Sequence, residues 1–470
     1  MRILLPTGSV TESLVRRAAA GYDADVVVTG EIASFLTPHA LRLLLKGTRY
    51  DCVIISGMCT ASFEQVERET GVPIYRGPRH AADLGSVLPL LGTETLSRTI
   101  PADDFLAARK AETALRTVGE RERDANPDFL IRGVKIGGGS RIKVLAEIMD
   151  AHRCGDIRPV VEDCLALGAD IVDLGFGFDA GADDVTRVFS QLLDIDAPLA
   201  VDTQDPSLIR AALGRCDIVL SLQETNIPVV GKEVGEAGAA AVVVPGNSTL
   251  KKNIVLAKKA GIRCIIADPL LQPVGSGFTP SLGGFKKIGC PLFFGAGNVV
   301  ELLDADSVGS NALLAGIAAE IGASVIFTSE HSDKTQGSIR EMRRATEMMV
   351  LAKDRPYPKD LGIDLLVLKE KRRRREPPLE YDTVQPARPM PDEITCDPKG
   401  NFRIGIEGDW IVAVIHGKAI RGVRWQDVLS TLLSQGDVSL LDHAGYLGRE
   451  LYKAELAIRY GRSFEQDGEF

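Results

Sequence analysis

The chain has 470 residues, of which 45% are hydrophobic and 25% charged, and its formal net charge is -9. This length predicts two or three domains, and the negative charge disfavours nucleic acid and anionic membrane surfaces as partners. The first ten residues lack the basic start and apolar core of a signal peptide, and no run reaches the ~18 apolar residues of a membrane span. We therefore expect a cytoplasmic protein.

The first predicted domain, residues 1–125, alternates short β-rich runs with helical patterns. Its candidate strands are Arg2–Leu5, Asp25–Val28, Cys52–Ile55 and Val72–Tyr75, with helical stretches such as Thr11–Ala20 and Pro38–Leu45 between them. The alternation predicts a small parallel sheet of the Rossmann or flavodoxin type. Polar residues gather where these strands end, which is the usual ligand crevice of an open α/β sheet, although the same residues are typical of turns. No GxGxxG pattern follows the first strand, so a dinucleotide is not expected.

Eight apolar runs, each ending in a polar or glycine-rich tip, follow one another within the second predicted domain, residues 133–355. They are Ile142–Asp150, Asp170–Phe176, Pro198–Thr203, Ile218–Glu224, Ala240–Gly246, Arg263–Leu270, Pro291–Gly297 and Ser324–Glu330. Near-continuous apolar strands are typical of a parallel sheet that is buried on both faces. Eight strand–helix units of even length indicate a (β/α)₈ barrel, whereas an open doubly wound sheet would give the same alternation with fewer units.

Beyond the barrel, the charged run Lys369–Pro378 leads into a proline-rich segment. We interpret it as a solvated linker or the end of a surface helix, because Glu and Pro flank its basic residues in an acidic chain. The third predicted domain, residues 400–470, has two strand patterns, Phe402–Ile406 and Trp410–His416, and a final helical pattern over 441–455. It reads as a small α+β module in which His443 is more typical of a packed structural residue than of a ligand. The predicted fold class is α/β.

Polar side chains stand at the carboxyl ends of the predicted barrel strands, where barrel enzymes place their working residues. The candidates are Glu147, Asp173, Asp202, Gln223, Asn226, Asp268, Asn298, His331 and Lys334. Inward carboxylates need hydrogen-bond donors, and the pair Asp202 and Asp268 suits a planar heterocycle rich in N–H groups, such as a pterin. Mg²⁺ is the competing occupant, and any single Asp could instead cap the following helix. No zinc site is expected, because the eight cysteines form no CxxC pair and no His/Cys cluster has ligand spacing.

Three of these strand segments resemble motifs of dihydropteroate synthase in order and spacing. They are Gly168–Gly175, Val201–Thr203 and Ile265–Pro269, and the resemblance covers the whole predicted barrel. Corrinoid-dependent methyltransferases that use methyl-tetrahydropterins share the same pterin-binding barrel. The resemblance implies that Asp202 and Asp268 hold the pterin ring, that Asp173 supports the floor of the pocket, and that the protein is a homodimer.

The loops that grip diphosphate and arylamine in dihydropteroate synthases differ in this chain. They correspond to residues 147–152, 176–181 and 295–301, and the Arg of the last-strand Arg-x-His pattern is Ser329, although His331 remains. Ordinary folate synthesis from p-aminobenzoate is therefore not expected. The three-domain layout, with the segments Ser329–Thr335 and Tyr446–Leu451, resembles instead the dihydropteroate synthase-related proteins of tetrahydromethanopterin-linked one-carbon metabolism.

The leading interpretation is a transferase that condenses 6-hydroxymethyl-dihydropterin diphosphate with an arylamine of the ribofuranosylaminobenzene type. His331 and Lys334 would stabilise the departing diphosphate, with which Mg²⁺ could bind. The alternative is a methyl-tetrahydropterin-dependent methyltransferase, with Asn226, Asn298 or Asn311 near the pterin N5. It would need a separate corrinoid protein, on the premise that this chain has no corrinoid-binding Asp-x-His-x-x-Gly pattern. A non-catalytic pterin-binding module is the third hypothesis.

Overall fold

The computed structural model describes residues 1–286, 288–354, 357–369, 379, 382–387, 389 and 396–468. The predicted linker Lys369–Pro378 lies outside the described residues except for Lys369 itself. The chain divides into two compact units, and each is described by itself below. The first comprises Met1–Ser329 and Ser338–Leu365, and the second comprises Glu330–Gly337 and Leu366–Phe470.

The chain begins with a four-stranded parallel sheet, as predicted. Its strands are β1 (Ile3–Thr7), β2 (Ala24–Val28), β3 (Cys52–Ile55) and β4 (Ile74–Arg76), in the order β2-β1-β3-β4. The helices beside it are α1 (Glu12–Ala18), α2 (Pro38–Leu44), α3 (Glu64–Thr70) and α4 (Leu84–Val87). Successive strand residues point to opposite faces, so that Leu5 and Ile54 belong to one apolar cluster and Leu4 and Val53 to another. Both faces of the sheet are therefore covered.

Two elements that the sequence patterns did not predict connect this sheet to the barrel. The first is the long helix α5 (Ala102–Asp124), whose Ala114 and Val118 pack in one cluster with Leu351 of the barrel's last helix. The second is an antiparallel hairpin of β5 (Phe129–Ile131) and β6 (Val134–Ile136). Ile131 and Ile136 of this hairpin share a cluster with the residues that point into the barrel. The hairpin therefore closes the amino-terminal end of the barrel.

The predicted (β/α)₈ barrel is confirmed by the strand pairing. Its strands are β7 (Lys143–Ile148), β8 (Ile171–Gly175), β9 (Leu199–Asp202), β10 (Ile218–Leu222), β11 (Ala240–Val243), β12 (Ile265–Ala267), β13 (Phe293–Phe294) and β14 (Val325–Ser329). All pair in parallel, in the order β12-β11-β10-β9-β8-β7-β14-β13, and a bridge between Ala267 and Leu292 joins the two ends of the sheet. The nearly closed ring places the carboxyl ends of all eight strands at one rim.

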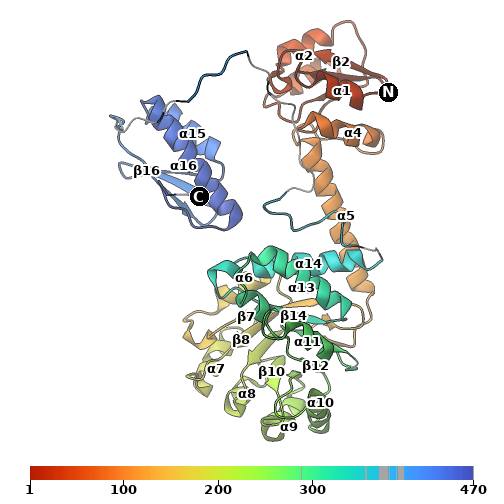
Figure 1. Ribbon diagram of the computed structural model, residues 1–470, viewed down its shortest axis with the longest axis vertical. Coiled ribbons are helices and arrows are strands. Elements are labelled where there is room, and N and C mark those ends of the chain that lie inside the picture. The colour runs from red at the N-terminus through yellow and green to blue at the C-terminus, as the bar shows by residue number, and fades with distance from the viewer. Residues whose placement is uncertain are drawn as a thin grey trace. The chain divides into compact units, whose positions relative to one another are not determined.

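Helices surround the barrel strands (Figure 1). They are α6 (Arg158–Leu167), α7 (Ala182–Ser190), α8 (Pro206–Ala212), α9 (Ile227–Ala237), α10 (Leu250–Lys259), α11 (Phe278–Ser281), α12 (Ala296–Glu301), α13 (Ser307–Glu320) and α14 (Ser338–Ala352). Several strands are shorter than their apolar runs, most clearly β13, because the chain turns into α12 at Ala296. Asn298, predicted at a strand tip, therefore lies in a helix. No helix of the described residues is long and apolar enough to cross a membrane.

The carboxyl-terminal part is a small α+β module, as predicted. Strands β15 (Arg403–Glu407), β16 (Trp410–Ile415) and β17 (Lys418–Gly422) form an antiparallel sheet, and α15 (Trp425–Ser434) and α16 (Leu441–Tyr460) follow it. The predicted structural role of His443 fits its surroundings, because its Nδ1 lies 3.0 Å from the buried carboxylate of Asp397 at the start of α16.

Candidate active site

Four carboxylates point into the barrel at its carboxyl-terminal rim. Leu145, Ile171, Ala200 and Ile266 belong to the cluster that fills the barrel interior. Residues two positions further along a strand point to the same side. The next inward positions on these strands are occupied by Glu147, Asp173, Asp202 and Asp268. The acidic layer therefore lies directly above an apolar one.

The carboxylates of Glu147, Asp173 and Asp202 lie together, with one oxygen from each within 4.8 Å of the others. Strand register explains this proximity, because Glu147 pairs with Asp173 across β7 and β8. Asp173 is fully buried, and neither of its oxygens has a hydrogen-bond partner. Asp268 follows β12, the strand at one end of the strand order. Its Oδ1 accepts a hydrogen bond of 2.8 Å from the backbone N–H of Leu270.

Burial raises the pKa of every member of this acidic layer, and repulsion from neighbouring carboxylates adds to the shift at Glu147, Asp173 and Asp268. Burial, followed by the charges of Asp202 and Glu301, raises the pKa of Glu147 to about 7. Burial raises the pKa of Asp202 to about 6 and that of Asp268 to about 7, where Asp202 adds to the effect. Burial also places the pKa of Asp173 well above its usual range. No Lys, Arg or His of the described residues is among the groups that shift these pKa values.

Such a layer can hold protons at neutral pH, or it can accept hydrogen bonds from N–H donors or bind a metal ion. Buried carboxylates without partners are unfavourable, so a ligand that supplies donors or positive charge is expected to bind here. Three of the four are also spaced as metal ligands, which keeps Mg²⁺ as a competing occupant.

The two predicted amide residues on the β10 loop are engaged in local hydrogen bonds. Asn226 is buried; its Oδ1 accepts from the N–H of Gln223 at 2.8 Å, and its Nδ2 donates to the carbonyl of Ser221 at 3.2 Å. The Gln223 side chain donates to Oε1 of Gln204 at 3.1 Å. Asn226 thus shapes the loop, whereas the half-buried Gln223 keeps free hydrogen-bonding capacity.

The remaining predicted residues have different surroundings. Asn298 is exposed in the first turn of α12, and Asn311 is buried in α13, where its Nδ2 donates to Ser338 Oγ at 3.2 Å. Asn311 therefore belongs to the helical layer and not to the strand tips. His331 and Lys334 lie in Glu330–Gly337, a segment of the second compact unit. Lys334 belongs to a 3-10 turn over Asp333–Thr335. The predicted role of His331 and Lys334 in stabilising a departing diphosphate stays a prediction.

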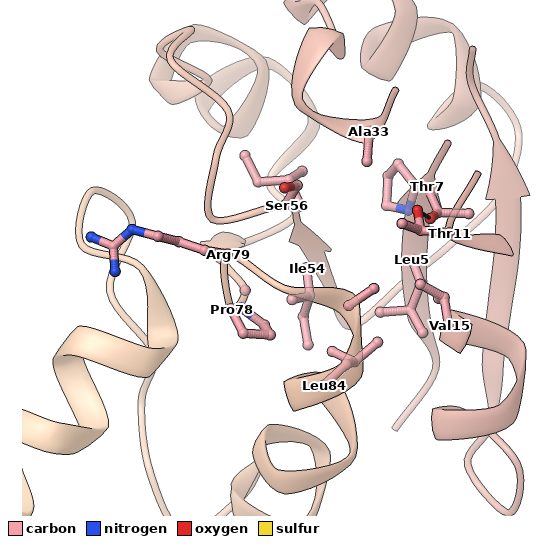
Figure 2. A pocket seen from close by; sticks show the side chains of 14 residues that line it. Leu5, Thr7, Thr11, Val15, Ala33, Ile54, Ser56, Pro78, Arg79 and Leu84 are labelled. Carbon is pink, nitrogen blue, oxygen red and sulfur yellow. Dashed lines mark hydrogen bonds between the residues drawn. The ribbon is translucent and has the colours of Figure 1, made fainter. Parts of the chain in front are cut away.

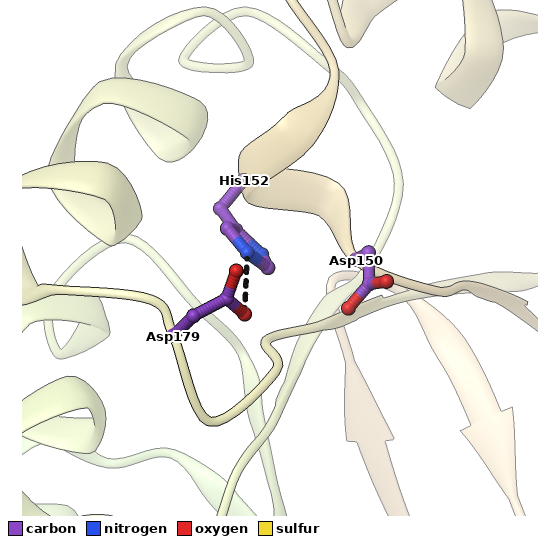
Figure 3. A group of neighbouring side chains, drawn as sticks. All are labelled: Asp150, His152 and Asp179. Carbon is purple, nitrogen blue, oxygen red and sulfur yellow. Dashed lines mark hydrogen bonds and ion pairs between the residues drawn. The ribbon is translucent and has the colours of Figure 1, made fainter.

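A second polar cluster, which was not predicted as a unit, comes from the loops after β7 and β8 (Figure 3). Asp150, His152 and Asp179 have ligand atoms within 4.8 Å of one another, and Nε2 of the buried His152 lies 3.1 Å from Oδ1 of Asp179. Arg153 forms ion pairs with both carboxylates, at 3.2 Å and 2.9 Å. A Cβ at Gly177 would lie 2.8 Å from Oδ1 of Asp150, so a larger residue there would displace the Asp150 carboxylate.

This cluster also corrects one premise of the sequence analysis. Asp150, His152 and Gly155 have the Asp-x-His-x-x-Gly spacing, so the pattern does occur in the chain. The side chain of His152 is only 7% exposed and already pairs with Asp179 on a barrel loop. The spacing alone therefore does not make the histidine available to a corrinoid.

Comparison with known proteins identifies one full-length relative. The chain is 34% identical over 517 aligned positions to the uncharacterized protein MJ0107 of Methanocaldococcus jannaschii, and the match covers 99% of this chain and 98% of the relative. Residues 396–467, which form the carboxyl-terminal module, match the family model PterinBD-DUF4346.

Solved structures similar to this chain are dihydropteroate synthases, the family that the strand motifs resemble. The Yersinia pestis enzyme is 19% identical, with 48% of this chain and 98% of that chain covered and a TM-score of 0.37. The Xanthomonas albilineans enzyme with 4-aminobenzoic acid is 18% identical, with 46% and 95% covered and a TM-score of 0.37. The Thermus thermophilus enzyme in complex with 6HMPPP is 19% identical, with 44% and 92% covered and a TM-score of 0.35. These TM-scores are low, and the barrel assignment rests on the strand pairing described above.

Proposed function

This chain belongs to the family of the uncharacterized protein MJ0107 of Methanocaldococcus jannaschii, and for it we propose a pterin-binding transferase of the dihydropteroate synthase type. The observation that carries the proposal is the acidic layer of the buried Asp173 and Asp268 and the half-buried Glu147 and Asp202, which has no cationic partner among the described residues. A pterin presents its 2-amino group and a ring N–H side by side. One carboxylate can accept both hydrogen bonds, and a second can accept from another edge of the ring.

We assign Asp202 and Asp268 as the residues that accept from the pterin, because both point into the barrel at its carboxyl-terminal rim and burial raises the pKa of both. Asp173, fully buried below them, would support the floor of the pocket. Glu147, Gln223 and Asn298 are further pterin contacts in this proposal, and Asn226 would hold the β10 loop that carries Gln223.

The reaction we propose joins 6-hydroxymethyl-dihydropterin diphosphate to an arylamine that bears a ribose-type substituent, in tetrahydromethanopterin biosynthesis. The amine nitrogen attacks the methylene carbon, the carbon–oxygen bond to diphosphate breaks, and the nitrogen releases a proton to solvent as diphosphate departs. Catalysis then consists of holding the two substrates in line and stabilising the negative charge of the leaving diphosphate. His331 and Lys334 are the proposed donors to that charge, and Mg²⁺ would accompany the diphosphate.

Calorimetric titration with 6-hydroxymethyl-dihydropterin tests the pocket. Asp202→Asn and Asp268→Asn should each weaken binding at least about tenfold, because a hydrogen bond to a charged acceptor is lost. Asp163→Asn, on the exposed face of α6, is the matched control and should bind like the wild type. Unchanged affinity in both site variants would contradict the assignment, as would binding that disappears when a chelator removes divalent metal.

Incubation with the diphosphate substrate tests the reaction. A condensed product should form with a ribosylated arylamine and not with p-aminobenzoate, as followed by mass spectrometry. Intact pterin binding with no condensed product from any amine would eliminate the transferase and leave a pterin-binding module.

A further inference from the structure

The amino-terminal sheet contains a hollow that the proposed pterin site does not use (Figure 2). It lies at the carboxyl ends of β1 and β3 and has a volume of about 440 Å³, which includes space open to solvent. The order β2-β1-β3-β4 means that the sheet grows in opposite directions from β1, so β1 and β3 flank a topological switch point. Ligands of open α/β sheets bind at such points.

The walls of this hollow are apolar and its edge carries hydroxyl groups. Leu5, Val15, Ile54 and Leu84 form the walls, and all four belong to the apolar cluster on one face of the sheet. Thr7, Thr11 and Ser56 stand at the edge, where Oγ1 of Thr7 and Oγ1 of Thr11 share a hydrogen bond of 2.9 Å. Apolar walls with a few polar groups at the edge suit a small planar ring.

Two arginines near the hollow differ in whether their charge is compensated. Arg79 lines the hollow, but its guanidinium points away from it in Figure 2 and is held by Asp103 and Asp104. Arg76, at the end of β4, is 8% exposed, and its Nε and Nη1 are buried without a hydrogen-bond partner. Its Nη2 donates to the carbonyl of Ala61 at 2.9 Å. Among the described residues, no carboxylate therefore pairs with the guanidinium of Arg76.

Arg76 lies one side chain away from the hollow. It interacts with the thiol of Cys59, and that thiol donates to the carbonyl of Ala33, a residue that lines the hollow. The loop over residues 56–61 contacts the guanidinium through Ala61 and Cys59, and Met58 within this loop is 55% exposed. A buried cation without a counter-charge is unfavourable, so an anion that reaches it would be strongly favoured.

We propose that this hollow binds a small ligand that combines a planar ring with one anionic group, a carboxylate or a phosphate. The ring lies between the apolar walls with its polar edge at Thr7, Thr11 and Ser56. The anionic group reaches Arg76 when the loop over residues 56–61 shifts, and it supplies the partner that the guanidinium lacks. The site is independent of the barrel and of its acidic layer.

The test uses the full-length protein with benzoate and adenosine 5′-monophosphate as anionic probes, and benzamide and adenosine as their uncharged counterparts. Hydrogen exchange read by mass spectrometry locates binding. At least one anion should protect peptides that cover residues 7–11 and 56–61, about tenfold more tightly than its uncharged counterpart. The benzoate and monophosphate arms separate a carboxylate ligand from a phosphate ligand. Protection by neither anion, or equal binding of charged and uncharged probes, would overturn the proposal.

Three variants separate binding from folding. Arg76→Met should remove the preference for the anion without lowering the melting temperature, because it deletes an unpaired buried charge. Arg17→Met, on the exposed face of α1, is the control and should bind like the wild type. Ile54→Trp should fill the hollow and abolish protection while pterin binding in the barrel persists. Unchanged anion binding in Arg76→Met, or in Ile54→Trp, would refute the site.

Discussion

Replacing Asp268 by Asn should make the barrel more stable at alkaline pH and weaken its binding of pterin. In the folded chain the pKa of Asp268 is about 7, against an ordinary value of 3.8, chiefly because the side chain is buried. Between pH 4 and pH 7 the folded state therefore holds a proton that the unfolded state has lost, and stability falls as pH rises through this window. A difference of about 3 in pKa corresponds to about 4 kcal/mol, reached in full above pH 7.

The Asp268→Asn variant cannot ionise and still offers Oδ1 to the N–H of Leu270. Its free energy of unfolding should exceed that of the wild type by up to about 4 kcal/mol at pH 8 and match it near pH 4. Urea unfolding followed by far-UV circular dichroism measures this difference. Both tryptophans, Trp410 and Trp425, lie in the carboxyl-terminal module, so their fluorescence reports that module separately. Equal stability gains at pH 4 and pH 8, or a loss at pH 8, would refute the electrostatic reasoning.

Three further predictions concern the pocket, the barrel and the terminal module. Pterin binding at pH 6 should release protons, because carboxylates with raised pKa values must ionise to accept hydrogen bonds from the ring. The release is measured as a dependence of the calorimetric binding enthalpy on the buffer, and Asp202→Asn should reduce it. Gly297→Ala should destabilise the barrel by about 1–3 kcal/mol, since its Cβ would lie 2.8 Å from the ring of Phe327. Gly309→Ala in α13 has open space around the new Cβ and should stabilise the barrel by about 0.5–1 kcal/mol. Thermal unfolding compares the two variants. Asp397→Ala should lower the urea midpoint of tryptophan fluorescence without changing the barrel transition, because Asp397 accepts several hydrogen bonds at the start of α16.

The regular part of the fold could be predicted because its strands are apolar and recur with helices between them. The acidic residues were also visible in the sequence, since Asp173 and Asp202 each follow an inward apolar residue by two positions. Their grouping with Glu147 depends on strand register, which places Glu147 beside Asp173 and which no single strand pattern contains.

Other features depend on contacts between segments that are distant in sequence. The hairpin of β5 and β6 consists of two three-residue strands around Arg132 and Gly133, too short for a periodic pattern. The cluster of His152 and Asp179 forms only when the loops after β7 and β8 meet. The unpaired Nε and Nη1 of Arg76 likewise become evident only in the fold, where the loop over residues 56–61 contacts the guanidinium through Ala61. In each case the signal is tertiary packing and not local propensity.

A crystal structure of the protein with 6-hydroxymethyl-dihydropterin tests the central claim most directly. We expect the 2-amino edge of the ring to lie within hydrogen-bond distance of Asp202 or Asp268, above the fully buried Asp173. A metal ion bound by Glu147, Asp173 and Asp202 with the pterin elsewhere would contradict it.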